Sequence, residues 1–212
     1  MKQSNQIPFG EKVVTYALCK KCVEKGSKVF IRFSHNLTIK QDRDWDYWTG
    51  TDIDFLEITK ERIIIGYEIK GMKKYKGRYE PSRLYEGLDQ AMGYLNLPFV
   101  KQKGNSKLKF DGGAFDFVYL VHARNEVEFL ECEKRIFDIV PIGFIIATPD
   151  GKFEIVKKAS KNPIQSKEAK QHFLNNLDSL KKFSLKSKIF KKIQEIGKGY
   201  FKESGKSETR DI

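Results

Sequence analysis

The 212-residue chain contains few of the residues that build disulfide frameworks, zinc sites or membrane spans. Three cysteines are too few for a disulfide framework; Cys19 and Cys22 are expected to be two buried residues one helical turn apart, with a redox pair as the alternative. His35, His122 and His172 are scattered without metal-ligand spacing. No run approaches about 18 consecutive apolar residues, and the N-terminal segment lacks an apolar signal core, so we expect an intracellular, cytoplasmic protein that does not enter a membrane.

Acidic residues are outnumbered by basic ones, 28 to 40, which gives a formal net charge of +12. A surplus this large favours a polyanionic partner, nucleic acid first and an anionic membrane surface second. Walker loops, dinucleotide-binding glycine fingerprints and nucleophile elbows are missing. Asp42, Asp44 and Asp46 have the spacing that begins a calcium loop, but Tyr47 occupies the position of the required glycine.

The apolar residues, 40% of the chain, are sufficient for a folded core. Their periodicity predicts helices over residues 9–25, 81–95, 126–139 and, in two pieces divided at 184–187, from 166 onward. Strands are predicted over residues 28–33, 51–58, 62–70, 116–122, 142–148 and 152–157, with loops over 35–50, 71–79 and 98–113. Strands that alternate with helices indicate an α/β sandwich with a mixed central sheet flanked by helices. We assign residues 1–160 to a core domain and 161–212 to a basic C-terminal helical extension packed on it.

Two neighbouring predicted strands carry an unusual set of charged residues. Side chains two apart on a strand share a face, so Asp52 and Asp54 point the same way, as do Glu68 and Lys70. Carboxylates held together repel one another unless a cation lies between them, and oxygen ligands without a nearby histidine favour Mg²⁺ or Mn²⁺ over Zn²⁺. A solvated face is the alternative, but three isoleucines at 63–65 lead into Glu68 and indicate a buried strand.

Asp54 followed by Glu68-Ile69-Lys70 resembles the signature of the PD-(D/E)xK nuclease superfamily, an acidic residue on one strand and acid-x-Lys on the next. Over about residues 9–122, the expected order of helix, three-strand meander, helix and strand is similar to the restriction-endonuclease-like αβββαβ core of that superfamily. The resemblance implies a Mg²⁺- or Mn²⁺-dependent deoxyribonuclease in which Asp54, Glu68 and the Ile69 carbonyl bind the metal and Lys70 is the catalytic lysine. Asp52 stays an alternative ligand, because the proline that precedes the first acid in the signature is absent.

The two flanking helices add three residues to this resemblance. Glu11 matches the acidic residue that many members carry on the first helix, which implies a further metal ligand; an acid favoured by the helix dipole is the alternative. Gln90 and Tyr94 resemble the Q-x-x-x-Y of RecB-like members and lie one turn apart. This implies that Gln90 contributes to catalysis and Tyr94 to DNA binding, unless the helix is simply amphipathic with a buried tyrosine.

The compact core and basic surface also resemble archaeal Holliday-junction resolvases and nuclease-like proteins of archaeal viruses. That resemblance implies a structure-directed endonuclease acting on duplex or branched DNA in replication, repair or recombination. It also implies a homodimer, to which we expect Phe99, Phe110 and Phe115 to contribute apolar surface. A DNA-binding protein that keeps the fold without catalysis is the alternative.

Two segments are rich in basic residues. The first follows Lys70 directly and carries four cations without an acid: Lys73, Lys74, Lys76 and Arg78. The second, residues 157–206, carries fourteen lysines and four acidic residues. Lysine-rich surfaces follow DNA phosphates without reading bases, so both segments are expected to hold DNA, with a solvated surface as the alternative.

Overall fold

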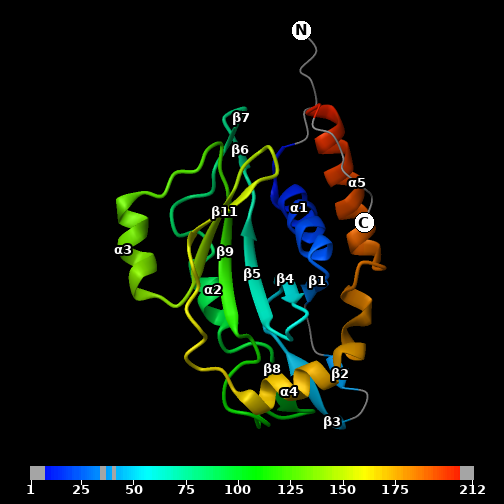
Figure 1. Ribbon diagram of the computed structural model, residues 1–212. Helices are drawn as coiled ribbons and strands as arrows, with labels where there is room; N and C mark the ends of the chain where they lie inside the picture. The colour runs from blue at the N-terminus through cyan, green and yellow to red at the C-terminus, as the bar shows by residue number, and fades with distance from the viewer. Residues whose placement is uncertain (1–7, 34–36, 40–41, 206–212) are drawn as a thin grey trace.

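A six-stranded mixed sheet lies at the centre of the computed structural model, which describes residues 8–33, 37–39 and 42–205 (Figure 1). Three central strands, β5, β9 and β10, run parallel, whereas β4 and β11 run antiparallel to their neighbours. The predicted α/β class with a mixed central sheet is therefore confirmed. In spatial order the strands are β1 (Lys28–Phe33), β4 (Ile53–Ile58), β5 (Ile64–Lys70), β9 (Phe117–Ala123), β10 (Gly143–Ala147) and β11 (Phe153–Lys157).

Helices cover both faces of this sheet. On one face α1 (Glu11–Glu24) and α5 (Lys188–Glu203) lie side by side, and on the other are α2 (Leu88–Tyr94) and α3 (Glu131–Ile139) (Figure 1). The central strands are buried on both sides, as parallel strands between helical layers usually are. In β5, for example, Ile64 packs into the apolar cluster with α2, whereas Tyr67 and Ile69 pack into the cluster with α1.

Two smaller sheets lie at opposite ends of the molecule. At one end β2 (Leu37–Ile39), β3 (Asp42–Trp48) and β8 (Phe99–Gln102) form a three-stranded sheet beside α4 (Lys167–Asn175) (Figure 1). At the other end β6 (Lys73–Tyr75) and β7 (Arg78–Glu80) form a hairpin.

These small sheets correct three expected loops, at residues 35–50, 71–79 and 98–113. The acidic residues in β3 obscured a strand whose Tyr47 is fully buried, and the basic residues in β6 and β7 obscured a hairpin that is mostly exposed. The aspartates at 42–46 belong to β3, so they do not form a calcium loop. His35 lies outside the described residues.

Two helices begin later than their periodicity predicted. The α2 helix starts at Leu88 instead of residue 81, because Tyr85 and Gly87 have positive φ angles of 64° and 86° that no helix accommodates. The α3 helix starts at Glu131, where the Glu133 carboxylate accepts the Leu130 N–H at 3.2 Å. Asn125, which directly precedes the predicted helix at 126–139 and has a residue type typical of N-caps, is therefore not its cap.

The C-terminal helices are built into both apolar clusters. Ser166 caps α4 by accepting the Ala169 N–H, and Ser187 caps α5 in the same way, which confirms the predicted division near residues 184–187. A 3₁₀ helix, η1 (Leu177–Phe183), lies between them and buries Leu180. Among the helices of the described residues, none is both long and apolar enough to cross a bilayer.

Gly197 on α5 provides a test of how this helix packs on α1. A Cβ at Gly197 would lie 2.3 Å from the Tyr16 ring, so we expect Gly197→Ala to lower the free energy of unfolding by about 1–3 kcal/mol. Gly93→Ala is the matched control, because nothing lies within 4 Å of its Cβ, and the gain in helix propensity should stabilise the protein by about 0.5–1 kcal/mol. Urea unfolding measures both, and equal effects of the two variants would contradict this packing.

Candidate active site

The strands β4 and β5 bring Asp54, Glu68 and Lys70 together. The Ile69 N–H donates to Asp54 Oδ2 at 2.9 Å, which ties the Asp54 carboxylate to β5. Lys70 Nζ lies 2.5 Å from Glu68 Oε1 and donates to Gln90 Oε1 at 2.7 Å. Glu68 is only 1% exposed. The spacing of the charged residues therefore predicted a real cluster in space.

Asp52 does not belong to this cluster. The β4 strand begins at Ile53, two residues later than predicted, and the Asp52 side chain is exposed. Only its backbone carbonyl faces the site, 2.7 Å from the Tyr94 hydroxyl. Of the two aspartates considered as the principal ligand, the structure places Asp54 beside Glu68.

Tyr94 has a different position from the one its expected role requires. Its side chain is fully buried, so contact with DNA is excluded in this conformation and the assignment of Tyr94 to DNA binding is wrong. The hydroxyl lies 2.5 Å from Glu68 Oε2 and accepts the Asp54 N–H at 3.2 Å. Tyr94 thereby links the strand of Asp54 to the carboxylate of Glu68.

Glu11 lies at the start of α1, close enough to Asp54 for its charge to raise the pKa of Asp54. Its carboxylate forms an ion pair with Arg32, which the sequence analysis did not single out. Arg32 has a φ of 48°, which is an uncommon backbone conformation for a residue other than glycine. The sequence carries no signal for this strain, because it arises where β1 meets the first turn of α1.

Two glycines allow the chain to close around the cluster. A Cβ at Gly71 would lie 1.9 Å from the Glu11 nitrogen, so only glycine lets α1 begin beside the end of β5. A Cβ at Gly87 would lie 2.5 Å from Lys70 Cε and 3.1 Å from Glu68 Cγ. The predicted helix at 81–95 concealed Gly87, whose left-handed conformation places the backbone directly over Lys70.

His122 supports the same region from β9, where it is paired in register with Lys70. Its Nε2 lies 2.8 Å from the carbonyl of Glu86, the residue before Gly87, and the side chain is fully buried. Burial lowers the pKa of His122 to about 4, so the imidazole is neutral near pH 7. This contact fixes the turn that covers Lys70.

The charges in the cluster are unevenly balanced. Burial, followed by the charge of Glu68, raises the pKa of Asp54 to about 8, although the Ile69 N–H and Lys70 oppose the change. Burial alone lowers the pKa of Lys70, but the hydrogen bond and charge of Glu68 outweigh it and raise that pKa above its ordinary value. Lys70 is therefore a stable ammonium ion, whereas the Asp54 carboxyl retains a proton to a higher pH than an ordinary aspartate.

Carboxylates suitable for a metal ion are few. In residues 8–33, 37–39 and 42–205, no group of three or more His, Cys, Asp and Glu side chains is arranged to hold one. Asp54 and Glu68 remain, with the Ile69 carbonyl on the same strand as Glu68. Both Glu68 oxygens already have partners in Lys70 and Tyr94, so a metal ion would compete with them.

The chain matches no protein-family model, no curated protein and no solved structure. The chemistry of the site must therefore be argued from its own geometry and charge.

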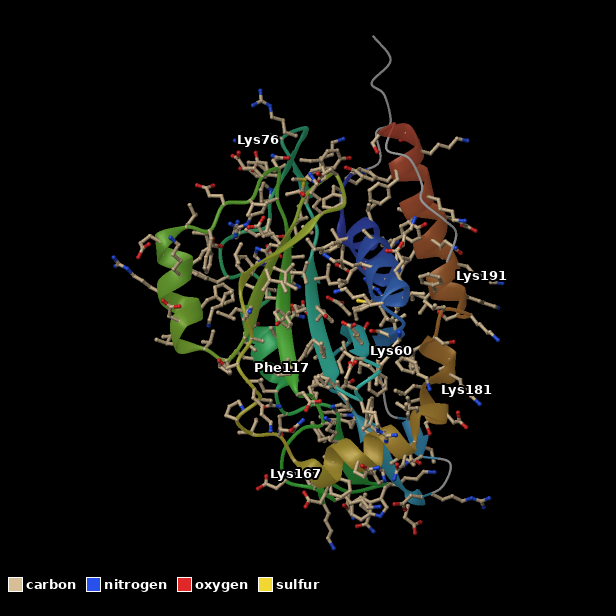
Figure 2. All side chains as sticks on the ribbon, in the orientation of Figure 1. Lys60, Lys76, Phe117, Lys167, Lys181 and Lys191 are labelled. Carbon is tan, nitrogen blue, oxygen red and sulfur yellow. The ribbon has the colours of Figure 1, made fainter. Side chains whose placement is uncertain are left out.

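The basic residues lie around the molecule rather than on one face. Lys73, Lys74, Lys76 and Arg78 are exposed on the β6–β7 hairpin, with Lys76 at its tip, and Lys73 forms an ion pair with Glu86 (Figure 2). Lys181 and Lys191 lie on η1 and α5, away from that hairpin.

The CxxC motif lies apart from this cluster. Cys19 and Cys22 are buried and free on α1, as predicted. Burial raises the pKa of Cys19 to about 12, which makes it a poor nucleophile.

The raised pKa of Asp54 predicts a pH-dependent stability in the absence of divalent cations. An unfolded aspartate titrates at about 3.9, whereas Asp54 in the folded protein titrates at about 8. The folded state binds more protons between these values, so the free energy of unfolding falls as pH rises through this window. Asp54→Asn removes the titrating group and should weaken this fall.

Urea unfolding in EDTA, at about pH 4.5 and about pH 9, measures this effect. The difference in free energy of unfolding, Asp54→Asn minus the unmodified protein, should be about 1–3 kcal/mol larger at about pH 9 than at about pH 4.5. One pKa unit corresponds to about 1.4 kcal/mol, and solvent screens part of this energy. Asp52→Asn is the matched control, because its side chain is exposed. Identical pH profiles for Asp54→Asn and the unmodified protein would contradict the burial argument.

Proposed function

We propose that the protein is a Mg²⁺- or Mn²⁺-dependent deoxyribonuclease. The observation that carries this proposal is the pairing of two carboxylates, Asp54 and the buried Glu68, on adjacent strands beside the ammonium of Lys70. A surface that only binds phosphate has no use for carboxylates, because they repel it. Nucleases that hydrolyse phosphodiesters need both features, a carboxylate site for a divalent ion and a cation for the phosphate.

The order of elements supports the same proposal. Helix α1, the strands β1, β4 and β5, helix α2 and strand β9 follow one another in the order of the αβββαβ core, with the small strands inserted between them. The β1–β4–β5 meander is antiparallel and β9 pairs with β5 in parallel. We therefore propose a restriction-endonuclease-like core.

The donor set suits the proposed metal ion, because carboxylate and carbonyl oxygens are the ligands that Mg²⁺ prefers. Asp54, Glu68 and the Ile69 carbonyl would hold it, and the raised pKa of Asp54 indicates negative charge still to be neutralised. When bound, such an ion activates water and offsets phosphate charge.

The remaining roles belong to side chains of this chain. Lys70, held by Glu68 and Gln90, stays protonated and donates to a phosphate oxygen as its charge grows. Gln90 therefore acts by orienting Lys70, while Tyr94 orients Glu68.

A binding protein without catalysis is the second candidate. It is favoured by Glu68, since both of its oxygens are satisfied by Lys70 and Tyr94 without a metal ion. A nuclease assay with and without divalent ions separates the two candidates.

The homodimer stays a prediction, and the three phenylalanines expected at its interface expose less apolar surface than the sequence indicated. Phe115 is fully buried, and Phe99 and Phe110 pack partly against the core.

Substitutions at the cluster test the chemistry. We expect DNA cleavage with Mg²⁺ or Mn²⁺, none in EDTA, and rates lowered about a hundredfold or more by Asp54→Ala, Glu68→Ala or Lys70→Ala. Asp52→Ala is the matched control and should cost far less, because its side chain is exposed. Wild-type rates in all three central variants, with cleavage persisting in excess chelator, would refute the assignment.

The β6–β7 hairpin predicts a specific salt dependence of DNA affinity. Replacing Lys74, Lys76 and Arg78 together by alanine should flatten the slope of log affinity against log salt by up to about 3 units, one for each lost phosphate contact. Lys73→Ala is the control within the same hairpin, and should change the slope less because Glu86 already pairs with Lys73. An unchanged slope in the triple variant, measured by fluorescence anisotropy, would mean that the hairpin lies away from DNA.

A further inference from the structure

The three-stranded sheet carries an aromatic face that the proposed active site does not use. Trp48 on β3 is paired in register with Phe99 on β8, and their ring centroids are 4.8 Å apart. Lys101 Nζ lies 4.6 Å from the centroid of the Trp48 ring. Because Asp46 pairs with Lys101 two positions away, these side chains share one face of the sheet.

Trp48 is unusual because it belongs to neither apolar cluster of the described residues. Phe99 and Trp45 pack partly against the α2-side cluster, but Trp48 is half-buried and has no such packing. The absence of a side chain at Gly50 leaves room for the ring, since a Cβ there would lie 3.2 Å from it. A large apolar ring kept in place at a half-exposed position is typical of a binding surface.

A second pair of ring and cation lies on the opposite face of β3, because Trp45 shares its side of the strand with Tyr47 and not with Trp48. Lys109 Nζ lies 5.2 Å from the centroid of the Trp45 ring, so each of the two tryptophans of the chain has a lysine over it. Packing of the small sheet does not require the contact between Trp48 and Lys101, because Tyr47 and Val100 on its other face are already buried in the core. The face of Trp48 combines the flat rings of Trp48 and Phe99 with the cation of Lys101, and the buried Asp46 lies beside Lys101 on the same face.

This face lies near the carboxylate cluster. Trp48 precedes Asp54 by six residues, so their Cα atoms are at most about 20 Å apart, or roughly six nucleotide steps of 3.4 Å. The connecting segment is anchored at the site, because the Asp52 carbonyl contacts Tyr94 and Thr49 is buried. A DNA strand bound at the carboxylate cluster can therefore reach Trp48 within roughly six nucleotides.

We propose that Trp48, Phe99 and Lys101 form a stacking site for unpaired nucleobases of DNA. Aromatic rings flanked by lysines bind single strands by stacking on base faces while the cations contact phosphates. Bases within a duplex are already stacked and offer only their edges to protein side chains. The substrate of the nuclease would then be DNA with a single-stranded segment; this last step rests on the proposed function, whereas the binding itself does not.

Intrinsic fluorescence tests the stacking site directly. Trp45→Phe leaves Trp48 as the sole tryptophan, since the chain has two. In EDTA, where no cleavage is expected, an oligothymidine single strand should quench Trp48 emission saturably. A blunt duplex of the same length should quench it little and bind about tenfold more weakly at equal salt.

Variants at Trp48 separate stacking from structural roles. Trp48→Leu, which keeps apolar bulk but has no aromatic face, should weaken single-strand affinity about tenfold, whereas Trp48→Phe should retain most of it. Thermal unfolding of both variants shows whether the fold is kept. Because quenching is read on a protein with Trp48 intact, it decides the matter even if Trp48→Leu is unstable.

Absence of quenching at saturating single strand, or equal affinity of Trp48→Leu and the unmodified protein, would overturn the stacking site. Cleavage of duplex without any quenching would overturn it while leaving the proposed nuclease intact. Quenching by single strands in a protein that cuts no DNA with Mg²⁺ or Mn²⁺ would overturn the nuclease and keep the stacking site.

Discussion

The electrostatic repulsion between Asp54 and Glu68 is the constraint on which the arrangement of this molecule depends. Glu68 is 1% exposed on a central strand, and burial together with the charge of Glu68 raises the pKa of Asp54 to about 8. A buried carboxylate pair is costly unless hydrogen bonds and cations compensate it. The Ile69 N–H and the Lys70 ammonium on β5, together with the Tyr94 hydroxyl on α2, provide that compensation.

Helix α2 is placed by this requirement as much as by apolar packing. Its start is delayed to Leu88, so that Gly87 covers Lys70 and Glu68, and its last turn brings Tyr94 to the carboxylate. His122 on β9 contacts the carbonyl of Glu86, the residue before Gly87. The same helix therefore seals one face of the sheet and supplies the hydrogen bonds that a charged core position needs. Both Glu68 oxygens already have partners in Lys70 and Tyr94, so a metal ion that binds there must exchange these partners.

The site lies where several elements meet, which bears on the proposed binding of DNA. The basic β6–β7 hairpin follows Lys70 by three residues, and the small sheet with Trp48 leads into β4. The hairpin is inserted between β5 and α2, and β2 and β3 are inserted between β1 and β4. A strand of nucleic acid lying between them would pass the carboxylate cluster.

Local patterns determined much of the outcome. The alternation of Asp54 to Ile58 and of Ile64 to Lys70 set the two strands and their shared charged face, because side-chain direction in a strand follows from backbone geometry alone. Ser166 and Ser187 marked helix starts for another local reason, because a serine side chain can accept an N–H group of the first helical turn. By contrast, the burial of Tyr94, the left-handed φ of Arg32 and Tyr85, and the pairing of β3 with β8 were decided by contacts between residues far apart in the chain. Such contacts override local preference, since a residue in a strained or unexpected conformation is held there by its neighbours in space and not by its neighbours in sequence.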